Sequence, residues 1–131
     1  MEYQVNIIGV LLMVLGILHS LFPRYFNWKS ELENLSLINR QMMYVHTFFI
    51  AFVVFFMGLL CIESAKELIH TSLGRKVSLG FSLFWFARFL TQFWGYSSKL
   101  WKGKPLETSI HILLSLFWAY LTFIFFLVYL S

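Results

Sequence analysis

Hydrophobic residues gather in four long runs along the chain, and three shorter segments between them carry most of the charged side chains. The runs cover residues 5–22, 42–62, 77–96 and 109–130. Each is close to the roughly 20 residues that a helix needs to cross a bilayer. None shows the strict alternation of a half-buried strand, and lipid leaves only helices or closed barrels able to satisfy the backbone. The pattern predicts an all-α fold: an integral membrane four-helix up-down bundle, formed by residues 1–131 as a single domain.

Composition supports a membrane environment. Of the 131 residues, 60% are hydrophobic and only 12% are charged, about half of the roughly 25% charged residues in soluble domains. The formal net charge is +4, which in such a chain reflects loop orientation rather than nucleic-acid binding. A single cysteine, Cys61, excludes an internal disulfide and any CxxC site. We therefore expect a multi-pass protein of the cell membrane, in contact with lipid and without a nucleic-acid partner.

The basic residues of the connecting segments predict an orientation. Segments 23–41 and 97–108 lie on one side of an up-down bundle, and segment 63–76 lies on the other. The first side holds six basic residues: Arg24, Lys29, Arg40, Lys99, Lys102 and Lys104. The second side holds three: Lys66, Arg75 and Lys76. The positive-inside rule then places segments 23–41 and 97–108 in the cytoplasm and both termini outside.

Two sequence signals predict where helices begin. Ser30 with Glu33 three residues later has the form of a capping box, and no Pro or Gly follows until Gly58. This predicts a helix that begins at Ser30 and continues into the second span. Pro105, with Glu107 near the positive end of the helix dipole, predicts that the fourth helix begins near Pro105.

Polar residues in the spans recur at helical spacing. One stripe in the third span and one in the fourth should each form a single face, and polar faces in lipid are expected to point into the bundle. In the first span the small residues Gly9 and Gly16 share a side with His19 and would permit close helix approach. The two stripes are Ser78, Ser82, Trp85, Arg88 and Gln92, and Glu107, His111, Ser115, Trp118 and Thr122.

Three histidines are expected at a similar depth, roughly 6–12 Å below the cytoplasmic boundary, given a rise of about 1.5 Å per residue. They are His19, His46 and His111, which with Glu107 form the predicted metal-binding set. Arg88, Gln92 and Arg40 are the predicted cofactor-binding residues. Simpler interpretations exist: each histidine could lie at the headgroups, Arg88 could snorkel, and Gln92 could serve only as a helix–helix hydrogen bond.

This layer suggests two classes of function. Neutral imidazoles in a bundle core can hold haem b or a transition metal ion (Fe, Zn or Cu), with arginines for the propionates. The first hypothesis is a buried His/Arg site near the cytoplasmic side with a redox or electron-transfer role. The alternative is a non-enzymatic carrier, channel subunit or assembly partner for a lipid, a quinone or protons. Arg88 should face inward and pair with an anion, which could be Glu107, a propionate or an anionic substrate.

Overall fold

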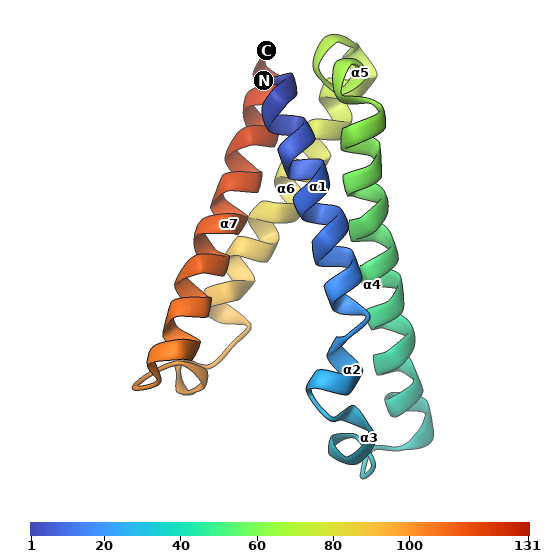
Figure 1. The fold of residues 1–131 in the computed structure, drawn as a ribbon, viewed down its shortest axis with the longest axis vertical. Coiled ribbons are helices and arrows are strands. Elements are labelled where there is room, and N and C mark those ends of the chain that lie inside the picture. The colour runs from blue at the N-terminus through green and yellow to red at the C-terminus, as the bar shows by residue number, and fades with distance from the viewer. The chain divides into compact units, whose positions relative to one another are not determined.

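The computed structural model describes all 131 residues, and they form helices without any strand (Figure 1). The all-α prediction is confirmed. The long helices are α1 (Glu2–His19), α4 (Leu37–Glu63), α6 (Ser72–Trp94) and α7 (Pro105–Leu130). The shorter elements are α2 (Phe22–Tyr25), α3 (Trp28–Glu31), α5 (Ala65–His70) and the 3-10 helix η1 (Ser98–Leu100).

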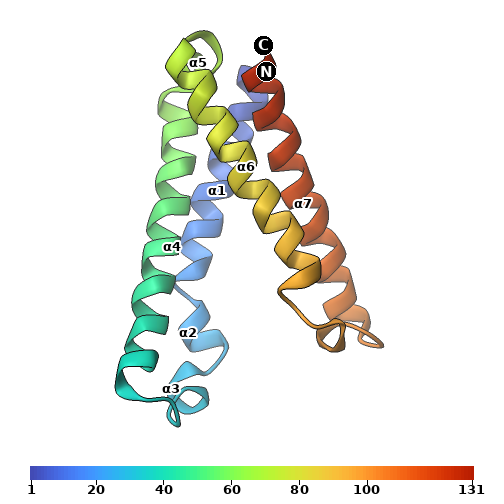
Figure 2. The same ribbon diagram turned by 180° about the vertical axis from the view of Figure 1, so that it is seen from behind.

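The chain divides into two compact units. One unit comprises residues 3–65 and is a hairpin in which α1 packs against α4. The other comprises residues 66–131 with residues 1–2, and in it α6 runs antiparallel beside α7 (Figure 2). Each unit is thus a pair of long helices with a connecting segment of its own.

Three helices are long and apolar enough to cross a membrane: α1 with 18 residues, α4 with 27 and α7 with 26. These overlap the predicted first, second and fourth spans, although α1 ends at His19, three residues before the predicted end of the first span. The third predicted span lies in α6, which has 23 residues but falls outside this group. Its polar residues explain the difference, because Arg88 and Gln92 interrupt the apolar run and Arg75 and Lys76 stand at its start.

Small residues bring α1 and α4 into close contact. A Cβ atom added at Gly58 would lie 2.5 Å from the backbone oxygen of Gly9, and one added at Gly9 would lie 2.8 Å from that of Gly58. One added at Gly16 would lie 2.9 Å from the oxygen of Ala51. The predicted close approach at Gly9 and Gly16 is confirmed. Only glycine permits the two backbones to touch where Gly9 meets Gly58.

The start of α4 differs from the prediction. The helix begins at Leu37, and the hydroxyl of Ser36 accepts a hydrogen bond from the backbone N–H of Asn39 at 3.4 Å. Ser30 lies inside the one-turn helix α3, which follows a left-handed residue, Asn27, with a φ of 55°. The prediction of a helix from Ser30 was therefore wrong, because the chain turns again before α4. The predicted start of α7 at Pro105 is confirmed.

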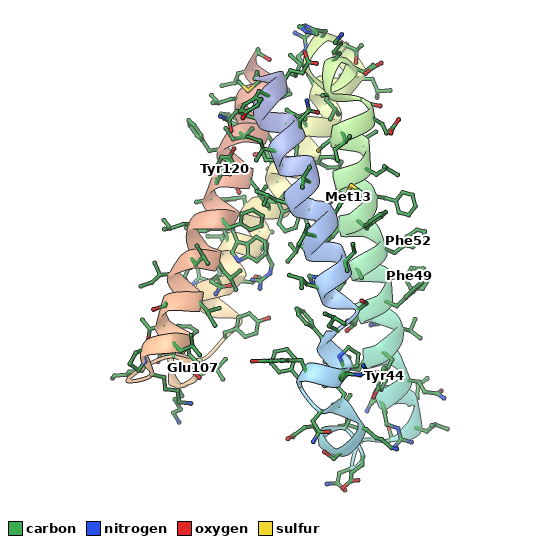
Figure 3. All side chains as sticks on the ribbon, viewed as in Figure 1. Met13, Tyr44, Phe49, Phe52, Glu107 and Tyr120 are labelled. Carbon is green, nitrogen blue, oxygen red and sulfur yellow. The ribbon has the colours of Figure 1, made fainter.

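Aromatic residues of the first unit take two different environments. Trp28 is buried and meets the Tyr44 ring edge-on at a centroid distance of 5.4 Å, which fastens the connecting segment to α4. Phe49 and Phe52 instead project outward from α4 (Figure 3) and are about half exposed. Such a surface suits lipid chains, since an exposed row of rings would be unfavourable in water.

The second unit is joined by hydrogen bonds at both ends and in its middle. At the start of α6, the Arg75 guanidinium donates to the backbone oxygen of Ser131 at 2.9 Å. Midway along the pair, the Ser82 hydroxyl donates to the backbone oxygen of Thr122 at 2.8 Å. A third hydrogen bond, between the side chains of Gln92 and His111, lies near the loop that links α6 to α7. The helix α6 therefore accompanies α7 over its whole length.

Candidate functional site

Gln92 is the centre of a polar cluster between α6 and α7. Its side chain is buried, and its Oε1 accepts hydrogen bonds from an Arg88 guanidinium nitrogen and from Trp118 Nε1, each at 3.2 Å. Both partners can only donate, so the atom that faces them must be the amide oxygen. The orientation of the Gln92 amide is thereby set by its neighbours. Its NH₂ group is directed at His111.

The hydrogen bond between Gln92 and His111 sets the tautomer of the imidazole. Gln92 Nε2 lies 2.9 Å from His111 Nδ1, and since the amide nitrogen donates, Nδ1 accepts. The proton of the neutral ring is then on Nε2. The ring also stacks on Trp101, with centroids 3.8 Å apart and an interplanar angle of 13°. His111 therefore offers an N–H donor at Nε2, rather than a lone pair for a metal.

Arg88 is half-buried and is surrounded by aromatic rings and neutral oxygens. Its guanidinium carbon lies 4.8 Å from the centroid of the Trp118 ring and 5.5 Å from that of Tyr96. A guanidinium nitrogen also donates to the Thr91 hydroxyl at 3.2 Å. These cation–π contacts and neutral acceptors hold the side chain in place, but they leave its positive charge without a counter-ion.

Glu107 is not the anion that neutralises Arg88. It lies in the first turn of α7, near the loop end of the hairpin (Figure 3), where its side chain is exposed. Within its unit, no salt bridge joins Glu107 to Arg88 or to any other residue. Glu107 precedes His111 by four residues in α7, and so lies one turn nearer to the helix end.

A stacked pair of indoles lies at the centre of the hairpin next to this cluster. The rings of Trp85 and Trp118 have centroids 5.3 Å apart and are nearly parallel, at 6°. Trp118 donates to Gln92, whereas the buried Trp85 Nε1 has no hydrogen-bond partner. The Trp85 Nε1–H is thus one further donor next to the cluster. Helical spacing puts one indole in each predicted polar stripe, but it does not predict their contact.

The structure brings together part of the predicted site. Arg88, Gln92 and His111 are connected by hydrogen bonds. Only Gln92 of the three is buried, so they do not form the buried His/Arg site that the first hypothesis requires. His19 and His46 belong to the other unit. There, His19 Nδ1 donates to the backbone oxygen of Leu15 at 2.8 Å, and His46 is exposed on α4.

The remaining predicted ligands have separate surroundings. Arg40 donates to the backbone oxygen of Glu33 at 3.4 Å. Neither unit on its own contains a group of three or more His, Cys, Asp or Glu side chains that could hold a metal ion. The shared site of His19, His46, His111 and Glu107 stays a prediction, because its members are divided between the two units.

Comparisons with protein-family models, with curated proteins and with solved structures gave no match to this chain.

Proposed function

We propose that this chain is a four-pass membrane protein that binds a membrane-soluble ligand through an anionic or carbonyl oxygen next to Arg88 and His111. The observation that carries the proposal is the orientation of the Gln92 amide. By accepting from Arg88 and donating to His111, it leaves a cation and a ring N–H on the same cluster, with no acidic residue between them. Such a cluster favours a ligand that supplies acceptor oxygens.

The hydrogen bonds along the second unit support a fourth membrane crossing. The helix α7 is long and apolar enough to span a bilayer, and α6 contacts it from Arg75 beside Ser131 to Gln92 beside His111. We expect a helix that accompanies such a partner over its full length to cross the membrane with it. The polar side chains of α6 become acceptable because they bond to α7 rather than face lipid.

The positions of the acidic residues suggest that the counter-ion of Arg88 comes from outside the chain. The acids stand in helix end turns or in short connecting elements, so none lies at the middle of a long helix: Glu2, Glu31, Glu33, Glu63, Glu67 and Glu107. A charged side chain within a membrane helix is costly unless it pairs or faces a polar cavity. The missing anion is then best supplied by a bound molecule, either an anionic amphiphile or the polarised oxygen of a quinone.

Haem or metal binding is the second candidate, and one observation favours it. The His19 Nδ1–H donates to the Leu15 carbonyl, which leaves Nε2 with a lone pair. Histidines that bind metals commonly have this arrangement, with the other ring nitrogen bonded to a carbonyl. A visible spectrum of the purified protein tests this directly. A Soret band would establish haem, and elemental analysis of a colourless preparation would detect Zn²⁺ or another metal.

The ligand proposal is tested by three variants purified in a mild detergent: Arg88→Met, Arg88→Lys and the control Arg75→Met. Each is titrated with a short-chain quinone and with a long-chain fatty acid, and quenching of tryptophan fluorescence is followed. We expect the wild type to bind the quinone or the fatty acid, and Arg88→Met to lose that binding. Arg88→Lys should bind the same probe more weakly, because Lys lacks the planar fork of donors. Arg75→Met should bind as the wild type does, since Arg75 lies at the opposite end of the hairpin.

Full binding by Arg88→Met would show that Arg88 only reaches toward headgroups, and the proposed site would then be wrong. Insertion is followed in parallel by membrane fractionation of each variant. The methionine side chain removes a charge that is costly in lipid, so loss of insertion is not expected.

A further inference from the structure

The loop that joins α6 to α7 is strongly basic. Residues 95–104, called here the basic loop, contain three lysines in a span of six residues, Lys99, Lys102 and Lys104, and all three are exposed. The nearest acidic residue in the sequence is Glu107, which makes no salt bridge. The positive charges of the basic loop therefore have no salt-bridge partner within its own unit.

The backbone of the basic loop is held in a defined conformation. The Ser97 hydroxyl caps η1, and the Thr108 hydroxyl donates to the backbone oxygen of Trp101. Gly103 takes a left-handed conformation with a φ of 76°. The Trp101 ring lies flat against His111. The loop is thus fastened to α7 on its inner side, while its lysine side chains extend outward.

Aromatic residues place the basic loop at the depth of lipid headgroups. Trp94 is 82% exposed and Tyr96 is 47% exposed, immediately after the apolar part of α6. Exposed Trp and Tyr at the end of a membrane helix are typical of the interface, where the ring meets lipid and the polar atom meets headgroups. The lysines that follow then stand among the phosphates.

The opposite end of the same hairpin lacks this excess of free positive charge. There Arg75 is engaged with the backbone oxygen of Ser131. That region has two exposed lysines, Lys66 and Lys76, and Glu67 directly follows Lys66, whereas residues 95–104 contain no acidic residue. Lysines are therefore concentrated at the loop end of the hairpin and are not equally in excess at both ends. We propose that the basic loop binds the phosphate headgroups of anionic phospholipids in the leaflet that it faces, a surface distinct from the ligand site at Arg88.

The expected size of the preference follows from membrane electrostatics. Each lysine near an anionic surface strengthens association by roughly fivefold at physiological salt. Removal of all three charges should therefore abolish most of the selectivity for anionic lipid. The effect should weaken as salt rises, since the Debye length falls from about 10 Å at 0.1 M to about 3 Å at 1 M.

The test uses the full chain in phosphatidylcholine vesicles that contain a minor share of phosphatidylglycerol. Two vesicle preparations are compared: in one the anionic lipid has brominated chains, and in the other the neutral lipid has them. The ratio of tryptophan quenching in the two preparations measures the enrichment of anionic lipid next to the protein. The test variant is Lys99→Gln/Lys102→Gln/Lys104→Gln, and the control is Lys66→Gln/Lys76→Gln. Subtracting the signal of Trp101→Phe isolates the quenching at the basic loop.

We expect the wild type and the control to show several-fold stronger quenching of Trp101 by the brominated anionic lipid, and the triple variant to show nearly equal quenching by both. Equal quenching in the wild type, or an equal loss in the control, would overturn the proposal. Soluble glycerol phosphate is added as a competitor. If it removes the preference at millimolar concentration, the surface binds soluble phosphates and the lipid assignment is wrong. Circular dichroism of each variant establishes that its helices are intact.

Discussion

Gln92 on α6 and His111 on α7 are joined by a hydrogen bond of 2.9 Å across the helix pair. The bond couples a buried amide to an imidazole that also stacks on Trp101. Because the same amide accepts from Arg88 and Trp118, three side chains bond to this one residue. Gln92 therefore determines how Arg88 and His111 are presented to a ligand.

Replacing Gln92 by Leu should destabilise the hairpin by about 1–3 kcal/mol, because the buried indole N–H of Trp118 loses its acceptor. The measurement is unfolding of the detergent-solubilised protein with increasing SDS, followed by circular dichroism. Thr91→Val serves as the control, since Thr91 is exposed and contacts only Arg88 within the cluster. A Leu variant as stable as this control would show that the cluster contributes nothing to packing.

Replacing Gln92 by Glu should preserve the hairpin but remove ligand binding. The carboxylate can still accept from Arg88 and Trp118, and it supplies the anion that Arg88 lacks in the wild type. It cannot donate to His111, so that bond is kept with the imidazole proton on Nδ1. The quinone and fatty-acid titrations described above measure the effect. Retained affinity in Gln92→Glu would mean that the free charge of Arg88 is not what attracts the ligand.

Helical periodicity predicted the two faces that meet in the second unit. Ser82 with Thr122, Gln92 with His111 and Trp85 with Trp118 are pairs between the two predicted stripes. The prediction of these faces was correct because polar groups in apolar helices have few partners other than one another.

Other features depended on information that spacing does not contain. Ser30 lies in a helix, α3, that ends after one turn at Glu31, and turns then separate it from α4, which Ser36 caps. The partner of Arg88 was also ambiguous, because a guanidinium can pair with a carboxylate or lie over aromatic rings. In the structure the Arg88 guanidinium lies over the rings of Trp118 and Tyr96.

Adding a methyl group at Gly58 should destabilise the first hairpin by about 1–3 kcal/mol, since the new Cβ would press on the backbone oxygen of Gly9 and on Met13. The matched control is Gly80→Ala in α6, where nothing lies within 4 Å of the added atom. That substitution should be neutral, or stabilising by up to about 1 kcal/mol through helix propensity. SDS unfolding curves compare the two. Equal effects at both positions would contradict the close contact of α1 and α4.

Replacing Ser82 by Ala should weaken the second hairpin by about 0.6 kcal/mol and by no more than about 1.7 kcal/mol, the range for hydrogen bonds between membrane helices. The lost bond is the one from its hydroxyl to the Thr122 carbonyl at 2.8 Å. Ser109→Ala is the control, because its hydroxyl bonds within α7 to the carbonyl of Pro105. A loss in Ser109→Ala as large as in Ser82→Ala would assign the effect to helix propensity instead.

The orientation is tested by labelling single cysteines in intact cells, in a Cys61→Ser background. Lys99→Cys places the thiol in the basic loop, and Lys66→Cys places it in α5 at the other end of α6. The excess of basic residues in segments 23–41 and 97–108 predicts a cytoplasmic basic loop. A membrane-impermeant maleimide should then label Lys66→Cys and leave Lys99→Cys unlabelled until the cells are permeabilised. Labelling of both in intact cells would mean that α6 does not cross the membrane, whereas the reverse pattern would invert the orientation but keep the crossing.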